Sequence, residues 1–134
     1  MLRILIVDDH PDTADVVGML LEALGHETTL ARTGLAALEA VERFRPDLVI
    51  LDIGLPDLSG YDVARAIRAR PLGALIHLVA ATGWGTAEDR VRALAAGFNQ
   101  HQLKPLDLPK LQAMIAAVTE RVTVPGHVAA SSSS

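Results

Sequence analysis

Short apolar runs alternate along the chain with segments in which apolar residues recur every three to four positions. Three of the runs are almost continuously apolar, as is typical of parallel strands buried on both faces, and they cover residues 2–7, 48–51 and 75–81. Two further strand candidates, 26–31 and 99–103, are polar, which favours the edges of a sheet. The pattern therefore predicts three central strands and two edge strands.

A helix is expected after each strand, because the intervening segments place their apolar residues on one helical face. For the fourth helix, Thr86 followed by Asp89 three residues later forms a weak capping box that marks the N-terminus. The side chains expected to be buried from this helix are Val91, Leu94 and Ala95.

This alternation predicts an α/β fold, a flavodoxin-like doubly wound parallel sheet of five strands with five helices on its two faces. Polar strands at both edges agree with the strand order 2-1-3-4-5. The chain has 134 residues, enough for one such domain and too few for two. We assign residues 1–122 to the domain and expect 123–134, TVPGHVAASSSS, to form a disordered tail.

Composition narrows the class of protein. The absence of cysteine excludes a disulfide framework and a thiolate metal site, and it fits a reducing compartment. A net charge of −4 argues against a broad nucleic-acid-binding face. No basic leader precedes the first apolar run, and the uncharged stretch 71–87 is too short and too rich in glycine and proline for a membrane helix. We therefore expect a cytoplasmic protein without a membrane segment, and without a DNA-binding domain because too few residues follow position 122.

Side chains suited to metal or phosphate binding stand at the ends of four of the five predicted strands. They are Asp8 and Asp9 after the first strand, Asp52 after the third, Thr82 at the end of the fourth and Lys104 after the fifth. The carboxyl ends of parallel strands share one edge, where α/β sheets bind their ligands. Taken singly, each aspartate is more simply explained as a helix cap or a turn residue.

As a set, these residues favour phosphoryl transfer assisted by a divalent cation. Three clustered carboxylates repel one another unless a hard cation such as Mg²⁺ lies among them. One carboxylate could act as the nucleophile, as in aspartyl phosphate formation. Thr82 and Lys104 could then contact the oxygens of the incoming phosphoryl group.

Four stretches resemble the receiver domain of two-component response regulators, chemotaxis receivers among them: ILIVDDH, LVILDIGLPDLSGYDVARAIR, AATG and AAGFNQHQLKP. The resemblance covers about residues 2–120, and it implies that Asp52 accepts a phosphoryl group from a histidine kinase or a phosphotransfer protein. The implied ligands of Mg²⁺ (or Mn²⁺) are Asp8, Asp9, Asp52 and the backbone carbonyl of Gly54. Thr82 takes the role of switch hydroxyl, Lys104 contacts the phosphoryl group, and the Lys104–Pro105 bond is expected to be cis. The last stretch is also similar to receivers fused to hybrid histidine kinases, which favours a phosphorelay.

Two positions near the expected site carry alternative interpretations. His101 stands three residues before Lys104, where family members often have a tyrosine or phenylalanine that turns inward on activation. A histidine can rotate and can titrate near neutral pH, so His101 is either a switch residue or a half-exposed edge-strand residue. Trp84, two residues after Thr82, is either a shield that slows hydrolysis of the acyl phosphate or a loop side chain packed on the fourth helix.

The resemblance implies a phosphorylation-dependent signalling switch whose output surface is formed by the fourth helix, the fifth strand and the fifth helix. We do not expect an enzyme in the ordinary sense, because such a protein catalyses only its own phosphorylation and autodephosphorylation. One alternative is a Mg²⁺-dependent aspartyl phosphohydrolase, although Gly54 stands where that class needs a second acid. The other is a degenerate receiver that acts only as a binding module, against which the complete set of site residues argues.

Overall fold

A five-stranded parallel sheet with helices on both faces organises the protein, and the computed structural model describes residues 1–83 and 85–123. The strands are β1 (Arg3–Val7), β2 (Glu27–Ala31), β3 (Leu48–Asp52), β4 (His77–Thr82) and β5 (Gln100–Leu103). The helices are α1 (Pro11–Ala23), α2 (Gly34–Phe44), α3 (Gly60–Arg68), α4 (Ala87–Ala96) and α5 (Leu108–Thr123), with a 3-10 helix η1 (Gly73–Leu75) before β4.

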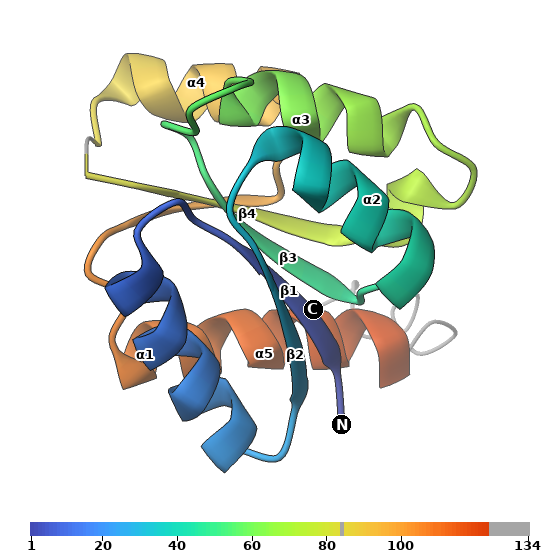
Figure 1. Ribbon diagram of the computed structural model, residues 1–134, viewed down its shortest axis with the longest axis vertical. Helices are drawn as coiled ribbons and strands as arrows, with labels where there is room; N and C mark the ends of the chain where they lie inside the picture. Colours follow the sequence, from blue (N-terminus) through green and yellow to red (C-terminus); the bar gives the residue numbers. More distant parts are fainter. Residues whose placement is uncertain (84, 124–134) are drawn as a thin grey trace, which may run out of the picture.

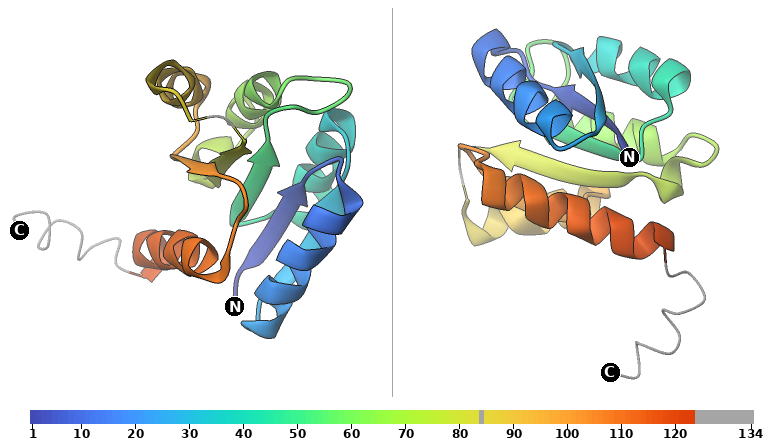
Figure 2. Two further views of the ribbon diagram at one scale, coloured as in Figure 1. Left: turned by 90° about the vertical axis from the view of Figure 1, so that its left-hand side faces the viewer. Right: turned by 90° about the horizontal axis from the view of Figure 1, so that it is seen from below.

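The sheet order is β2-β1-β3-β4-β5 and all four strand pairs are parallel, which confirms the predicted fold class. In Figure 1, α1 and α5 lie below the sheet and α2, α3 and α4 lie above it. The two views of Figure 2 show the same layers from the side and from below. Residues 124–134 of the expected tail lie outside the described residues.

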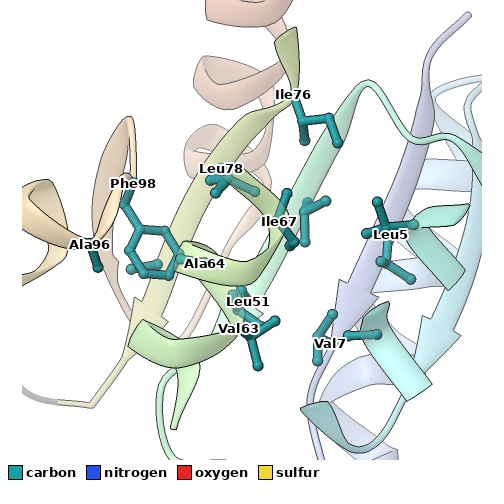
Figure 3. Packing of buried hydrophobic residues seen from close by; sticks show 14 of the residues in the cluster. Leu5, Val7, Leu51, Val63, Ala64, Ile67, Ile76, Leu78, Ala96 and Phe98 are labelled. Carbon is teal, nitrogen blue, oxygen red and sulfur yellow. The ribbon is translucent and has the colours of Figure 1, made fainter. Parts of the chain in front are cut away.

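Two apolar layers fill the space between the sheet and its helices, because successive side chains of a strand point to opposite faces. In β1, Leu5 and Val7 enter the layer under α2, α3 and α4, whereas Ile4 and Ile6 enter the layer under α1 and α5. Figure 3 shows the first of these layers, with Phe98 beside Ala96 at one end of it. The central strands are therefore buried on both faces, as their continuous apolar runs predict.

The predicted buried stripe of α4 is wrong. Val91 and Leu94 are 66% and 64% exposed, and Ala95 is also exposed, whereas Ala93 and Ala96 face the core. Apolar residues occur all round this helix, so its periodicity does not define one inner face. The small alanines let α4 pack close to the sheet, and two large apolar side chains are left on the surface.

The fourth strand also begins later than predicted, at His77 instead of Leu75. The preceding residues form η1, in which Leu75 is 70% exposed. Gly73 is required in this connection, because a side chain there would collide with the carbonyl oxygen of Ile67. No helix within residues 1–83 and 85–123 combines the length and the apolar character that a membrane span requires.

Candidate functional site

The residues predicted from the strand ends meet at the carboxyl edge of the sheet. Asp8 follows β1 directly, Asp52 ends β3, and Thr82 ends β4. Asp52 pairs in register with Ala81, so Thr82 extends one residue further along the neighbouring strand. Lys104 follows β5, and its backbone N–H donates to the Thr82 carbonyl oxygen at 2.8 Å.

Lys104 lies between two buried carboxylates. Its Nζ donates to Asp8 Oδ2 at 3.0 Å and lies 3.3 Å from Asp52 Oδ2. The side chains of Asp8 and Asp52 are only 7% and 9% exposed, and that of Lys104 is 22% exposed. Charges this poorly solvated interact strongly, so one ammonium offsets much of the repulsion between the two carboxylates.

The pKa values of this pair reflect the same contacts. Burial raises the pKa of Asp8, but the backbone N–H of His10 and the Lys104 ammonium outweigh burial, so the net shift is downward. Burial lowers the pKa of Lys104, but Asp8 and Asp52 outweigh it and the net shift is upward. Asp8 and Lys104 are therefore both charged at neutral pH.

Four side chains at this edge form a cluster able to hold a metal ion. One ligand atom from each of Asp8, Asp9, His10 and Asp52 lies within 4.8 Å of the others. Asp9 Oδ1 is buried and accepts no hydrogen bond from any described residue, although His10 Nδ1 lies 3.2 Å away. A cluster of carboxylates with a buried oxygen left over fits a hard divalent cation, which binds oxygen ligands.

The loop after β3 fixes the Asp52 carboxylate. The backbone N–H of Gly54 donates to Asp52 Oδ1 at 3.2 Å. Gly60 begins α3 so close to β3 that a Cβ there would come within 2.7 Å of the Asp52 carbonyl oxygen. Ser59 caps the same helix by accepting from the Asp62 N–H at 3.1 Å. Asp52 is therefore held at the start of a well-capped strand-to-helix connection.

Two contacts near this edge were not predicted. His10, 68% exposed at its side chain, lies with Nδ1 3.1 Å from Asp8 Oδ1. Asp57 accepts hydrogen bonds from the backbone N–H groups of Gly34 (2.7 Å) and Leu35 (3.0 Å), which caps α2 from the β3–α3 loop and lowers the pKa of Asp57. The Asp57 contacts span more than twenty residues of sequence, so no local sequence pattern predicts them.

His101 points toward α4. It pairs in register with Ala80, which belongs to the apolar layer under α2, α3 and α4, so its side chain leaves β5 on that face of the sheet. Both ring nitrogens are buried without a hydrogen-bond partner among the described residues. Burial lowers the pKa of His101, Arg90 on α4 lowers it further, and Asp89 partly offsets them. Trp84 lies outside the described residues, and the Lys104–Pro105 bond is cis, as the resemblance implied.

Comparison with known proteins gives consistent matches over nearly the whole fold. The family described as the response regulator receiver domain matches residues 4–116. An uncharacterized 14.6 kDa protein of Leptolyngbya boryana is 38% identical over 106 residues, which are 79% of this chain and 81% of that protein. The probable transcriptional regulatory protein TcrX of Mycobacterium tuberculosis is 36% identical over 92% of this chain and 52% of its own. The chain thus spans about half the length of that regulator.

A solved structure with a similar fold is the receiver domain of the sensor histidine kinase PA1611 from Pseudomonas aeruginosa. It aligns with a TM-score of 0.79 and 34% identity, over 87% of this chain and 95% of its own, and its structure has a magnesium ion coordinated in the active-site cleft. The parallel sheet order, the convergent strand ends and these matches agree. The chain belongs to the response regulator receiver domain family and is a receiver domain of two-component signalling.

Proposed function

We propose that the protein is a phosphorylation-dependent switch in which Asp52 accepts a phosphoryl group from a histidine kinase or a histidine phosphotransfer protein. The observation that carries this proposal is the position of Lys104, whose ammonium reaches Asp8 and Asp52 at 3.0 and 3.3 Å. Asp52 is buried, fixed by the Gly54 N–H, and located at the edge of the sheet where this class of fold binds its ligands. We place the protein in the cytoplasm, in keeping with its lack of cysteine.

In the proposed transfer, an Asp52 carboxylate oxygen attacks the phosphorus of a phosphohistidine. A P–O bond forms as the P–N bond breaks, and the freed imidazole takes up a proton. Lys104 and Thr82 contact the phosphoryl oxygens, where negative charge must be stabilised. Asp8, Asp9, Asp52 and the Gly54 carbonyl would hold Mg²⁺ or Mn²⁺, whose positive charge would help to stabilise the phosphoryl group during transfer. The reaction is stoichiometric, and autodephosphorylation returns the protein to its starting state.

Intact mass measured with acetyl phosphate and Mg²⁺ tests this proposal. We expect a labile increase of one phosphoryl group in the unmodified protein and none in Asp52→Asn. Asp57→Asn is the matched control, because Asp57 lies outside the cluster and an asparagine can still cap α2. An adduct that survives in Asp52→Asn contradicts the assignment. Rapid turnover of unrelated phosphate esters would instead favour the hydrolase, and no adduct at all would favour the binding module.

We propose that the output surface lies on α4, β5 and α5. Large apolar side chains on these elements are exposed, as expected of a surface that contacts another protein; they are Val91, Leu94, Leu103 and Leu108. We expect acetyl phosphate and Mg²⁺ to change amide hydrogen exchange in α4 and β5 more than in α1 and β2, with no change in Asp52→Asn. Exchange changes confined to α1 and β2 would contradict this surface.

We also propose that His101 couples the α4–β5 contact to pH. The folded state disfavours protonation of this ring, so the unfolded chain binds the extra proton as pH falls through about 6.5. The free energy of unfolding should therefore decrease between about pH 7 and pH 5.5, and decrease less in His101→Phe. Urea denaturation at both pH values measures the difference. The pKa of His26 is also lowered, so His26→Phe shows how much of the decrease in the free energy of unfolding comes from that residue. An equal decrease in His101→Phe and the unmodified protein would contradict the role.

A further inference from the structure

His10 follows the two acids of the candidate metal site, in the turn that leads from β1 into α1, both drawn in blue in Figure 1. Its ring lies against both acids, with Nδ1 3.1 Å from Asp8 Oδ1 and 3.2 Å from Asp9 Oδ1. Ionised carboxylate oxygens only accept hydrogen bonds, so the hydrogen at this contact is on the ring nitrogen. The imidazole therefore presents a positive hydrogen to the oxygens at which a cation would bind.

The start of α1 does not explain this position of the ring. His10 is the N-cap of α1, where serine, threonine, asparagine or aspartate usually accepts from a backbone N–H of the first turn. The His10 side chain makes no such hydrogen bond. Among residues 1–83 and 85–123, the polar contacts of the ring are with Asp8 and Asp9. The ring is thus placed by the acids of the cluster.

The oxygens of these acids are already engaged. Asp8 Oδ1 also accepts from the backbone N–H of His10 at 2.9 Å, and Asp8 Oδ2 accepts from Lys104 Nζ at 3.0 Å. Asp9 Oδ1 is buried, with His10 Nδ1 beside it. Mg²⁺ binds its oxygen ligands at about 2.0–2.1 Å. The ion can therefore reach Asp9 Oδ1 only after a neighbouring group has moved.

The His10 ring is the neighbour that moves most easily. The backbone N–H of His10 is fixed by the turn between β1 and α1. Lys104 is only 22% exposed and also reaches Asp52 Oδ2 at 3.3 Å, so its movement would break two contacts with buried carboxylates. The His10 side chain is 68% exposed. Rotation about its side-chain bonds takes the ring into water, where its nitrogens are hydrated.

We propose that the His10 ring occupies the place of the metal ion in the metal-free protein and rotates away when Mg²⁺ binds. The ring thereby lowers the metal affinity, because the ion must replace a charge-assisted hydrogen bond to the acids. This inference rests on the metal site proposed above and gives His10 a positioning role outside the set of metal ligands. The Mg²⁺ concentration needed for phosphorylation then depends on a residue that contacts neither the ion nor the phosphoryl group.

Isothermal titration of Mg²⁺ into the unmodified protein and into His10→Ser tests the inference. We expect about fivefold tighter binding in His10→Ser, because no ring hydrogen bond has to be broken. Serine is favoured at an N-cap, so the variant will fold. His26→Gln is the matched control, since it removes a histidine just before β2 and glutamine can still accept from the Leu2 N–H. Its affinity for Mg²⁺ should be unchanged.

Two further measurements separate displacement of the ring from a purely structural role. The ring C–H signals of His10, assigned by their loss in His10→Ser, should shift in NMR spectra as Mg²⁺ saturates the unmodified protein, whereas those of His26 should not. With acetyl phosphate, His10→Ser should reach its half-maximal rate at about fivefold lower Mg²⁺, with the maximal rate unchanged.

An unchanged affinity in His10→Ser, or ring signals that do not respond to Mg²⁺, would overturn the inference and leave the function proposed for Asp52 intact. Weaker Mg²⁺ binding in His10→Ser would make the ring a metal ligand and would also overturn it. If neither protein bound Mg²⁺, the proposed metal site itself would be contradicted together with the role of His10.

Discussion

Replacing Lys104 with methionine should slow phosphorylation of Asp52 by acetyl phosphate by roughly 10²–10³-fold, the usual cost of one group that stabilises developing charge. The ammonium lies 3.3 Å from Asp52 Oδ2 and is held by Asp8, so it is positioned before the donor arrives. Single-turnover kinetics followed by intact mass measure the rate. Lys110→Met is the control, because Lys110 donates to the Leu103 and Pro105 carbonyl oxygens instead of the cluster.

The same variant should bind Mg²⁺ more tightly. Without the ammonium, the carboxylates of Asp8 and Asp52 repel each other unshielded, and a divalent cation relieves more repulsion. Isothermal titration of Mg²⁺ into the unphosphorylated protein measures this change. Tighter binding together with slower phosphorylation separates a role in transfer from a general loss of structure. A variant that is phosphorylated at the normal rate would show that Lys104 only balances charge.

Replacing Arg68 with methionine should lower the free energy of unfolding by about 3 kcal/mol, because several carbonyl acceptors lose a charged donor. Arg68 Nε donates to Gly97 O at 2.9 Å, Nη1 to Gly73 O (2.7 Å) and Ile76 O (2.6 Å), and Nη2 to Asn99 Oδ1 at 2.8 Å. One side chain thereby joins α3, η1, the start of β4 and the turn before β5. Lysine at this position should not restore stability, since an ammonium lacks the planar fork that reaches these acceptors.

Urea denaturation at neutral pH measures the effect, and Arg65→Met is the matched control on the same helix. Arg65 is exposed, and among residues 1–83 and 85–123 its one ion pair is with Asp62, at 2.9 Å and three residues away. Its loss should therefore change stability by less than about 0.5 kcal/mol. If Arg68→Met and Arg65→Met were equally stable, the contacts of Arg68 would have no net effect on the fold.

The convergence of the candidate site residues was predictable from the sequence because it depends on strand order and strand ends. Apolar runs that stop at Asp8, Asp52 and Thr82 define buried parallel strands, and parallel strands bring their carboxyl ends together. The edge positions of β2 and β5 follow from their polar sequences in the same way. Burial of the central strands on both faces is a property that a single sequence expresses strongly, as short continuous apolar runs.

Contacts made by long side chains across the fold could not be predicted. Asp57 caps a helix that begins 23 residues earlier in the chain, and Arg68 reaches a turn 29 residues later. Neither contact is predicted by a periodic pattern of apolar residues in the sequence. The burial of Val91 and Leu94 was predicted wrongly because α4 is apolar on several faces, and only its packing against the sheet selects the alanines. When the faces of a helix are similarly apolar, tertiary packing decides which of them is buried.

The central claim, that Asp52 is the phosphoryl acceptor, is tested most directly by locating the acyl phosphate in the chain. After incubation with acetyl phosphate and Mg²⁺, borohydride reduces an aspartyl phosphate to homoserine, and peptide mapping then identifies the modified position. We predict homoserine at position 52 alone. Homoserine at Asp8, Asp9 or Asp57, or no reduction product in a protein that has gained phosphoryl mass, would contradict the account.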